Sequence, residues 1–203
     1  MLHKLMSNSF FSTDNTDESL LIQRRNLLKY GMVGIVSMAT PLLMPTSAQA
    51  AKNKGAWKTS FRNAHTDESF SGVYRVGDKY LPDAFERINY VLRDFRTDEV
   101  FPMDPHILDI ITVLHQKMRA KVPFHILSGY RSPKTNAMLR RNTNGVASNS
   151  FHMYGQALDI RLPGMSTKKL RNTAQSLRAG GVGYYPRSNF VHIDTGKPRN
   201  WTS

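Results

Sequence analysis

The feature that most constrains the fold is the stretch 150–159, which places a histidine and a carboxylate on either side of a glycine. His152 and Asp159 are seven residues apart, with Gly155 between them. The large apolar residues that follow occupy alternate positions, at Leu158, Ile160 and Leu162. This alternation predicts a turn that leads into a half-buried strand. The apolar face of that strand is expected to face the core, so Asp159 is expected on the opposite face.

A second segment, 189–194, has the same alternation. It places Val191 and Ile193 on one face and the remaining residues on the other, namely Phe190, His192 and Asp194. Two histidines and one aspartate on two neighbouring strands would supply three metal ligands. A catalytic zinc ion typically has three protein ligands and an open fourth position. The chain has no cysteine, which excludes thiolate-rich structural zinc sites.

Four spaced motifs carry a family resemblance: Ser-Gly-Tyr-Arg-Ser at 128–132, the stretch 150–159, and the segments 181–186 and 190–196. Together they resemble the zinc D-Ala-D-Ala peptidase family, which shares its fold with the hedgehog signalling domain. More narrowly, they resemble the MepK type of murein endopeptidase. The resemblance covers most of the chain after about Phe70.

The resemblance implies a zinc-dependent endopeptidase that hydrolyses the peptide cross-links of peptidoglycan. It implies that Zn²⁺ is bound by His152, Asp159 and His192. It also implies that Arg131 binds the substrate or the developing oxyanion, and a guanidinium group suits both a carboxylate and an amide oxygen that gains charge. A solvated surface arginine is the alternative interpretation of Arg131.

The sequence allows two interpretations of the residue that would act as general base. Many relatives carry Glu or Asp three residues before the last histidine, where this chain has Asn189. Asp194 is the candidate proton acceptor, because it shares a strand face with His192. Alternatively, Asp194 orients a histidine ring and takes no proton.

The first fifty residues are interpreted as a twin-arginine signal peptide. Arg24 and Arg25 precede a moderately apolar stretch, 31–44, that is too short to span a bilayer stably. Residues 45–50 end in an Ala-x-Ala cleavage pattern, so the mature protein is expected to begin at Ala51. The twin-arginine translocase is therefore an expected partner, the periplasm the expected location, and no stable membrane span is expected after cleavage.

The mature chain is strongly basic. Removal of residues 1–50 takes away four basic and three acidic residues, which lowers the formal charge from +13 to +12. Nucleic acid, anionic lipid and an anionic wall polymer all attract such a charge. An exported protein meets peptidoglycan first, and the chain has no aromatic-basic motif for nucleic acid, so a nucleic-acid partner is not expected.

The rest of the chain predicts one α+β domain, with an antiparallel sheet and flanking helices. Residues 51–80 are expected to form an arm or hairpin, and 81–203 the zinc peptidase domain. Proline and capping residues predict helices that start near Pro82, Pro105, Pro133 and Thr167. Three further histidines are not expected to bind the metal: His106 and His115 are interpreted as surface or packing residues, and His125 as a structural residue of a strand.

Two other functions remain open at this stage. One is a non-catalytic cell-wall-binding domain that retains a structural zinc site, which Asn189 favours. The other is a D,D-carboxypeptidase, since the sequence does not distinguish endopeptidase from carboxypeptidase activity.

Overall fold

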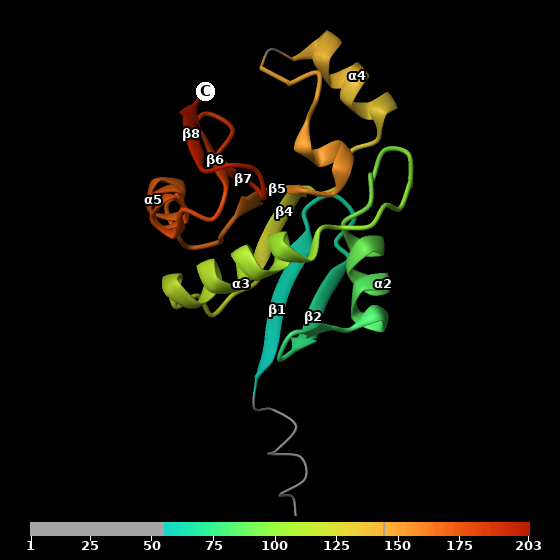
Figure 1. Cartoon of the computed structure of the whole chain (residues 1–203). Coiled ribbons are helices and arrows are strands. Elements are labelled where there is room, and N and C mark those ends of the chain that lie inside the picture. Colours follow the sequence, from blue (N-terminus) through green and yellow to red (C-terminus); the bar gives the residue numbers. More distant parts are fainter. Residues whose placement is uncertain (1–54, 144) are drawn as a thin grey trace, which may run out of the picture. The chain divides into compact units, whose positions relative to one another are not determined.

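The computed structural model describes residues 55–143 and 145–203, so the predicted signal peptide lies outside the described residues. These residues form an eight-stranded sheet with helices packed against it (Figure 1). The elements in chain order are β1 Ala56–Asn63, β2 Ser69–Val76, β3 Lys79–Tyr80, α2 Pro82–Val91, α3 Pro105–Met118, β4 Phe124–Ser128, α4 Pro133–Asn142, η2 Phe151–Tyr154, β5 Ala157–Arg161, α5 Thr167–Leu177, β6 Gly181–Tyr185, β7 Phe190–Asp194 and β8 Arg199–Thr202. The α+β class expected from the sequence is confirmed.

The sheet is mixed, whereas the sequence predicted an antiparallel one. Its strand order is β3-β2-β1-β4-β5-β7-β6-β8, and the pairs β1–β4 and β6–β8 are parallel. A parallel pair needs a long crossover, and the chain between β1 and β4 supplies one with a hairpin and two helices. β7 runs antiparallel to β6. The chain then reverses again, so β8 lies beside β6 and runs parallel to it.

The predicted N-terminal hairpin is an integral part of this sheet. β1 pairs antiparallel with β2 on one side and parallel with β4 on the other. The hairpin therefore continues the sheet that carries β5 and β7, and it is not a separate arm.

The helices begin where the sequence indicated. The side chain of Asp104 accepts a hydrogen bond from His106 N at the start of α3, and the side chain of Ser132 accepts one from Thr135 N at the start of α4. Each cap satisfies a backbone N–H that the helix itself leaves unpaired. Helix α5 begins at Thr167 as expected, behind the cap Ser166.

The core lies between one face of the sheet and helices α2, α3 and α5. In Figure 1, α3 crosses this face, with α5 and α2 to either side of it. Helix α2 contacts β2, α3 contacts β1, and α5 contacts β6 and β7. The large side chains in this layer are almost fully buried, and they include Phe61, Ile88, Leu108, Ile111, Phe124, Leu158, Ile160 and Val191. No helix in the described part of the chain is both long and apolar enough to cross a bilayer.

Candidate metal centre and active site

Strands β5 and β7 bring two of the predicted ligands together. They pair antiparallel, with Asp159 directly opposite His192. The predicted alternation is confirmed, because Leu158 and Ile193 lie in the core. Side chains directly opposite in an antiparallel pair are close enough to touch. Asp159 and His192 therefore meet on the sheet face that is turned away from the core.

The third residue, His152, comes from the 3₁₀ helix η2 and not from a strand. Gly155 ends η2 with a φ of 66°, and a Cβ at this position would collide with the carbonyl oxygen of Pro102. The carbonyl oxygen of Gly155 accepts a hydrogen bond from Asp104 N at 2.9 Å. The glycine thus allows η2 to pack against the start of α3 while its histidine reaches β5.

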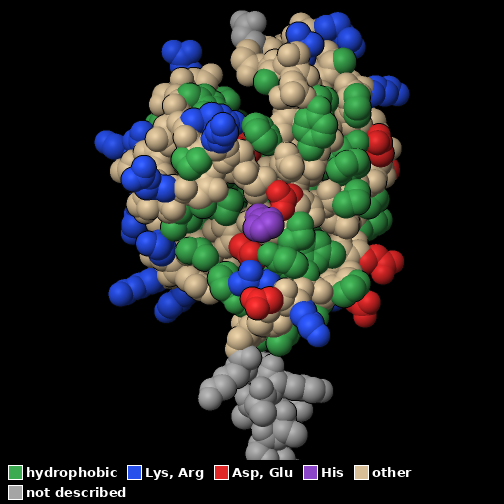
Figure 2. Space-filling model, viewed as in Figure 1, with side chains coloured by type: hydrophobic (Ala, Val, Ile, Leu, Met, Phe, Trp, Pro, Cys, Tyr) green, Lys and Arg blue, Asp and Glu red, His purple; other side chains and the backbone are tan. Residues whose placement is uncertain are grey.

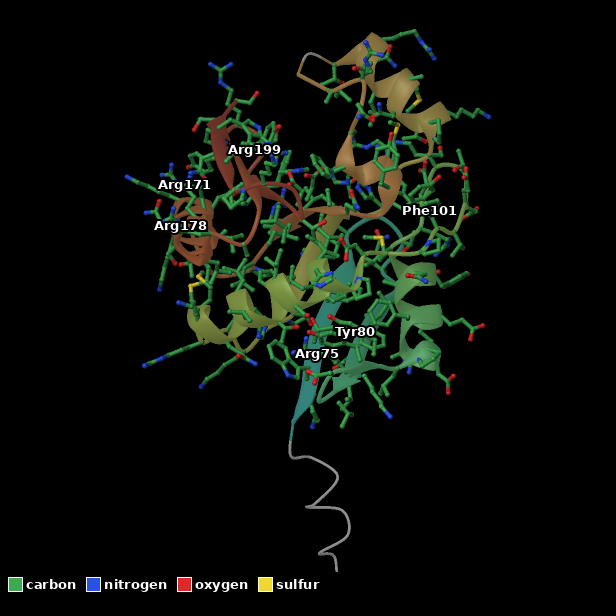
Figure 3. The ribbon with its side chains drawn as sticks, viewed as in Figure 1. Arg75, Tyr80, Phe101, Arg171, Arg178 and Arg199 are labelled. Atoms are coloured by element: carbon green, nitrogen blue, oxygen red, sulfur yellow. The ribbon has the colours of Figure 1, made fainter. Side chains whose placement is uncertain are left out.

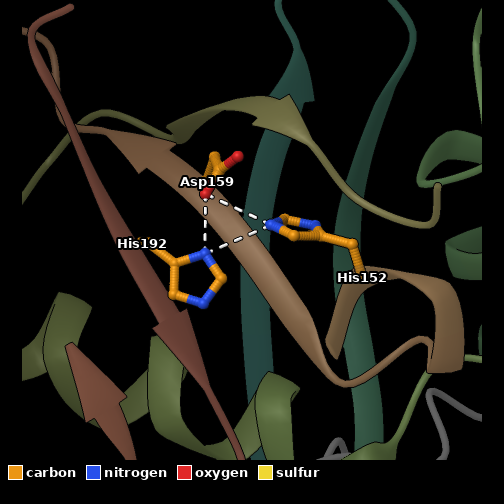
Figure 4. A group of neighbouring side chains, drawn as sticks. All are labelled: His152, Asp159 and His192. Atoms are coloured by element: carbon orange, nitrogen blue, oxygen red, sulfur yellow. Dashed lines mark hydrogen bonds and ion pairs between the residues drawn. The ribbon is translucent and has the colours of Figure 1, made fainter. Parts of the chain in front are cut away.

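The three side chains converge on one point (Figure 4). His192 Nδ1 lies 2.9 Å from Asp159 Oδ1 and 3.2 Å from His152 Nε2. His152 Nε2 lies 3.3 Å from the same carboxylate oxygen. Zinc bonds of about 2.0–2.1 Å in a tetrahedron would separate the ligand atoms by about 3.3 Å. The observed spacing therefore fits a zinc ion with three protein ligands.

Hydrogen bonds on the far sides of both imidazoles fix which nitrogens face this point. His152 Nδ1 lies 2.7 Å from the carbonyl oxygen of Gly129, which can only accept, so this nitrogen carries the proton. His192 Nε2 donates to Asp194 Oδ2 at 3.0 Å. His152 therefore turns a lone pair toward the oxygen of Asp159, and His192 does so whenever Nε2 carries its only proton. Three acceptors this close require a cation between them, either a metal ion or a proton.

The charges of the cluster agree with this requirement. Burial raises the pKa of Asp159, but His152 and His192 outweigh burial and hold this pKa well below its usual range. Burial lowers the pKa of His152 and keeps its ring neutral. Burial also acts to lower the pKa of His192, but hydrogen bonds to Asp159 and Asp194 raise it overall. An ionised carboxylate beside two histidines is a donor set that suits zinc.

The cluster lies in the wall of an open cavity of about 560 Å³. One side of the cavity is the loop after α4, which contributes Thr143, Gly145, Val146, Ala147, Asn149 and Ser150. The opposite side comes from β6, β7 and β8. A hollow between α4 and β8 is visible at the upper edge of Figure 2.

Arg131 lines this cavity beside Asp159. Its guanidinium nitrogens lie 3.4–3.5 Å from oxygens of Ser128, Asn136 and Asp159, and its buried Nε has no hydrogen-bond partner. Charge-assisted hydrogen bonds are normally shorter, about 2.7–2.9 Å. Burial lowers the pKa of Arg131, although a guanidinium stays charged. Arg131 is therefore a cation in the cavity wall with donors that are only weakly engaged.

Asp194 lies behind His192 and does not line the cavity. Its side chain is fully buried, and its contact with His192 is to Nε2, the nitrogen that faces away from the cluster. Burial raises the pKa of Asp194, but hydrogen bonds from His192 and Arg199 hold it far below its usual range. This geometry favours an orienting carboxylate over a proton acceptor.

Asn189 also faces away from the cluster. It has a φ of 53°, a left-handed conformation that asparagine tolerates, and its side chain accepts a hydrogen bond from the hydroxyl of Thr167 in α5. Position 189 in this chain therefore serves the turn before β7, and it contributes no ligand to the cluster.

Two residues of β8 belong to the site and were not predicted from the sequence. Arg199 binds both oxygens of Asp194, and the ring of Trp201 lies 5.3 Å from that of His192, centroid to centroid. The only signal was their spacing of two residues, which places both side chains on one strand face. A four-residue strand directly after Pro198 gives too short a pattern to recognise.

The three other histidines considered in the sequence analysis lie outside the cluster. His106 is mostly exposed beside Asp104, and His115 Nε2 lies 2.8 Å from the carbonyl oxygen of Val122. His125 lies in β4, where it pairs with Arg161 of β5. Among the described residues, one group of three or more potential ligand residues converges: His152, Asp159 and His192.

Comparison with known proteins identifies the family of this chain. A family model described as peptidoglycan L,D-endopeptidase MepK matches residues 50–201. The peptidoglycan L,D-endopeptidase MepK of Escherichia coli strain K12 is 38% identical over 179 residues, covering 88% of this chain and 96% of the relative. The probable peptidoglycan L,D-endopeptidase MepK of Haemophilus influenzae is 41% identical over 143 residues, covering 70% of this chain and 77% of the relative. The chain therefore belongs to the peptidoglycan L,D-endopeptidase MepK family of peptidases.

Proposed function

We propose that this chain is a zinc-dependent murein endopeptidase that hydrolyses L,D peptide cross-links of peptidoglycan in the periplasm. The observation that carries the proposal is the convergence of three acceptor atoms in the wall of an open cavity. The family supplies the reaction class, and the names of the relatives supply the type of cross-link.

In this proposal His152, Asp159 and His192 hold the zinc ion. Bound zinc would polarise the scissile carbonyl group and lower the pKa of a water molecule. Arg131 would donate to a carbonyl oxygen as it gains negative charge, or to a carboxylate of the substrate. Its weakly engaged donors support this role, because they can turn toward a ligand without breaking a strong ion pair.

We assign Asp194 to the orientation of His192. Of the residues that line the described cavity, Asp159 is the one with an acidic side chain, and its Oδ1 belongs to the metal cluster. Asp194 is sealed behind the imidazole, where a water molecule in the cavity cannot reach it. A carboxylate in this position fixes the tautomer of a metal-ligand histidine and makes the ring a better ligand.

The charge of the cavity supports an acidic peptide as substrate. Arg131 and Arg187 line it and are positively charged. The negative charge of Asp159 would be balanced by the bound zinc ion. Cross-linked wall peptides carry free carboxylates, which such a surface attracts. We also propose export by the twin-arginine route with residues 1–50 as the signal, on the sequence evidence given above.

A non-catalytic wall-binding domain with a structural zinc ion is the second candidate. The lack of a second Asp or Glu side chain in the described cavity lining favours it, because a proton acceptor is a usual part of peptide hydrolysis.

Digestion of purified sacculi separates the two candidates. The mature protein should release soluble muropeptides, and a chelator should abolish the release until zinc is added back. Analysis of the products distinguishes cleaved cross-links from the loss of a terminal D-alanine, which a carboxypeptidase would cause. Sacculi that bind the zinc-loaded protein but release nothing would favour the non-catalytic candidate.

A further inference from the structure

The C-terminal strand supplies an arginine to the residue behind the metal cluster. Arg199 Nη1 lies 2.9 Å from Asp194 Oδ1, and Nη2 lies 2.7 Å from Oδ2. The guanidinium group thus holds both carboxylate oxygens at once. Figure 3 shows Arg199 on β8, the last strand of the chain.

The remaining contacts of Asp194 complete its environment. Its Oδ1 also accepts hydrogen bonds from Gly181 N at 3.2 Å and Gly196 N at 2.9 Å. Its Oδ2 is left to accept from His192 Nε2 and from Arg199. Both oxygens of this buried carboxylate are therefore engaged, and of its partners in the described part of the chain, His192 is the one that belongs to the metal cluster.

The space for the guanidinium group depends on two glycines. A Cβ at Gly181 would collide with Arg199 Nη1 and with Asp194 Oδ2. A Cβ at Gly196 would lie 2.9 Å from Asp194 Oδ1 and 3.0 Å from Arg199 Nη1. The guanidinium carbon also lies 5.0 Å from the ring centroid of Phe151 and 5.1 Å from that of Trp201. Backbone, glycines and aromatic rings together define one position for this side chain.

We propose that Arg199 is a positioning residue for the metal centre, acting through Asp194 on His192. This inference rests on the proposed function, because it assumes that His192 is a zinc ligand. A planar guanidinium that binds both oxygens fixes the plane of the carboxylate. The fixed carboxylate accepts a hydrogen bond from the Nε2–H group of His192, and so keeps Nδ1 directed at Asp159 and His152 as a ligand for the metal.

The test compares zinc affinity across variants, measured by competition with a chromogenic chelator. Arg199→Ala should weaken zinc binding about 10–100-fold, the range for partners that orient a metal ligand. Arg199→Lys keeps the charge but cannot form the two-point contact, so its loss should be smaller. Arg140→Ala is the matched control, because Arg140 is an exposed arginine in the last turn of α4.

A double-mutant cycle tests whether Arg199 acts through Asp194. If it does, adding Arg199→Ala to Asp194→Asn should weaken zinc binding little beyond the single Asp194→Asn change. Nitrogen NMR of the His192 ring in the zinc-free protein, at a pH high enough for the ring to be neutral, should also show a mixture of tautomers in Arg199→Ala. A merely structural role would lower the thermal stability of Arg199→Ala and leave the tautomer and the zinc affinity of its folded form unchanged.

The variant His192→Ala distinguishes failure of the proposed metal site from failure of the inference about Arg199. If His192→Ala binds zinc as tightly as the wild type, the proposed metal site is wrong. If His192→Ala loses zinc but folded Arg199→Ala and Arg199→Lys retain wild-type affinity, the inference about Arg199 is overturned and the metal site stands. Fully additive effects in the cycle would also overturn it.

Discussion

At the scale of single residues, the site is defined as much by the hydrogen bonds behind the histidines as by the atoms that meet. The carbonyl oxygen of Gly129 accepts a hydrogen bond from one ring, and Asp194 accepts one from the other. Each partner turns a lone pair toward Asp159. The preference of this point for a cation follows from these two distant contacts.

Asp194→Asn tests the role of that carboxylate. The change should weaken zinc affinity about 10–100-fold, and excess zinc should restore turnover, because the neutral amide orients His192 less well. Zinc affinity and the rate on cross-linked muropeptides are measured together. A variant that keeps its zinc but loses ~10²–10⁴-fold in turnover would instead identify Asp194 as the general base. Wild-type rate and affinity would exclude both roles.

At the scale of elements, the site depends on how closely strands β6 and β8 approach. Gly183 of β6 pairs with both His192 of β7 and Trp201 of β8. A Cβ at Gly183 would lie 2.5 Å from the indole ring of Trp201, so Gly183→Ala should displace this ring from the cavity wall.

The expected cost of Gly183→Ala is about 1–3 kcal/mol of stability, together with reduced activity, because the added methyl group overpacks the site. Indole fluorescence in a Trp57→Phe background reports the displacement, and urea unfolding reports the stability. Gly72→Ala is the control, because its Cβ would make an ordinary contact of 3.5 Å with Phe70. Equal effects of both changes would contradict the account.

At the start of α4, the buried carboxylate of Asp94 should make the stability of the fold depend on pH. Asp94 Oδ2 accepts hydrogen bonds from Ser132 N at 2.9 Å and Ser132 Oγ at 2.7 Å. Burial raises the pKa of Asp94, but the hydrogen bonds from Thr135 and Ser132 lower it overall. The folded protein therefore binds this proton less readily than the unfolded chain does.

Asp94 should thus stabilise the fold fully above its ordinary pKa of 3.8, and this stabilisation should be lost as the pH falls toward the lower pKa of the folded state. Asp94→Asn should cost about 1–3 kcal/mol near pH 7. Urea unfolding of both proteins should show this difference shrinking below about pH 4. A difference that is constant down to pH 2 would contradict the account.

The sequence predicted the elements whose residues form a regular pattern. Alternation located β5 and β7, and caps with prolines located α3 and α4, because these signals are local. The parallel pairs were missed because strand direction depends on long connections that leave no local pattern. Strand β8 was missed because it is short, and with it the roles of Arg199 and Trp201. The position of Asp194 behind the imidazole depends on which ring nitrogen faces the cluster, and this is a tertiary property.

At the scale of the whole molecule, positive charge is spread over a large part of the surface. In Figure 2, Lys and Arg side chains gather on the side that carries α5 and around α4. The α5 contribution includes Lys168, Lys169 and Arg171. The formal charge of +12 derived above for the predicted mature chain favours association with an anionic wall before the cavity engages a cross-link.

Export is the other property of the whole chain. Changing Arg24→Lys together with Arg25→Lys should block processing and export, because a twin-arginine signal is recognised through the arginine pair. Immunoblots of periplasmic and cytoplasmic fractions measure the result. Normal amounts of processed protein in the periplasm would mean that the chain uses another route.

The central claim is that one zinc ion, held by His152, Asp159 and His192, makes this chain a murein endopeptidase. The most direct measurement is the rate of cross-link hydrolysis while zinc is titrated into the metal-free protein. The rate should rise from near zero and reach its plateau at one zinc per chain, and His152→Ala should stay inactive at that ratio. Full activity in the metal-free protein, or in zinc-saturated protein with all three ligand residues changed to alanine, would contradict the claim.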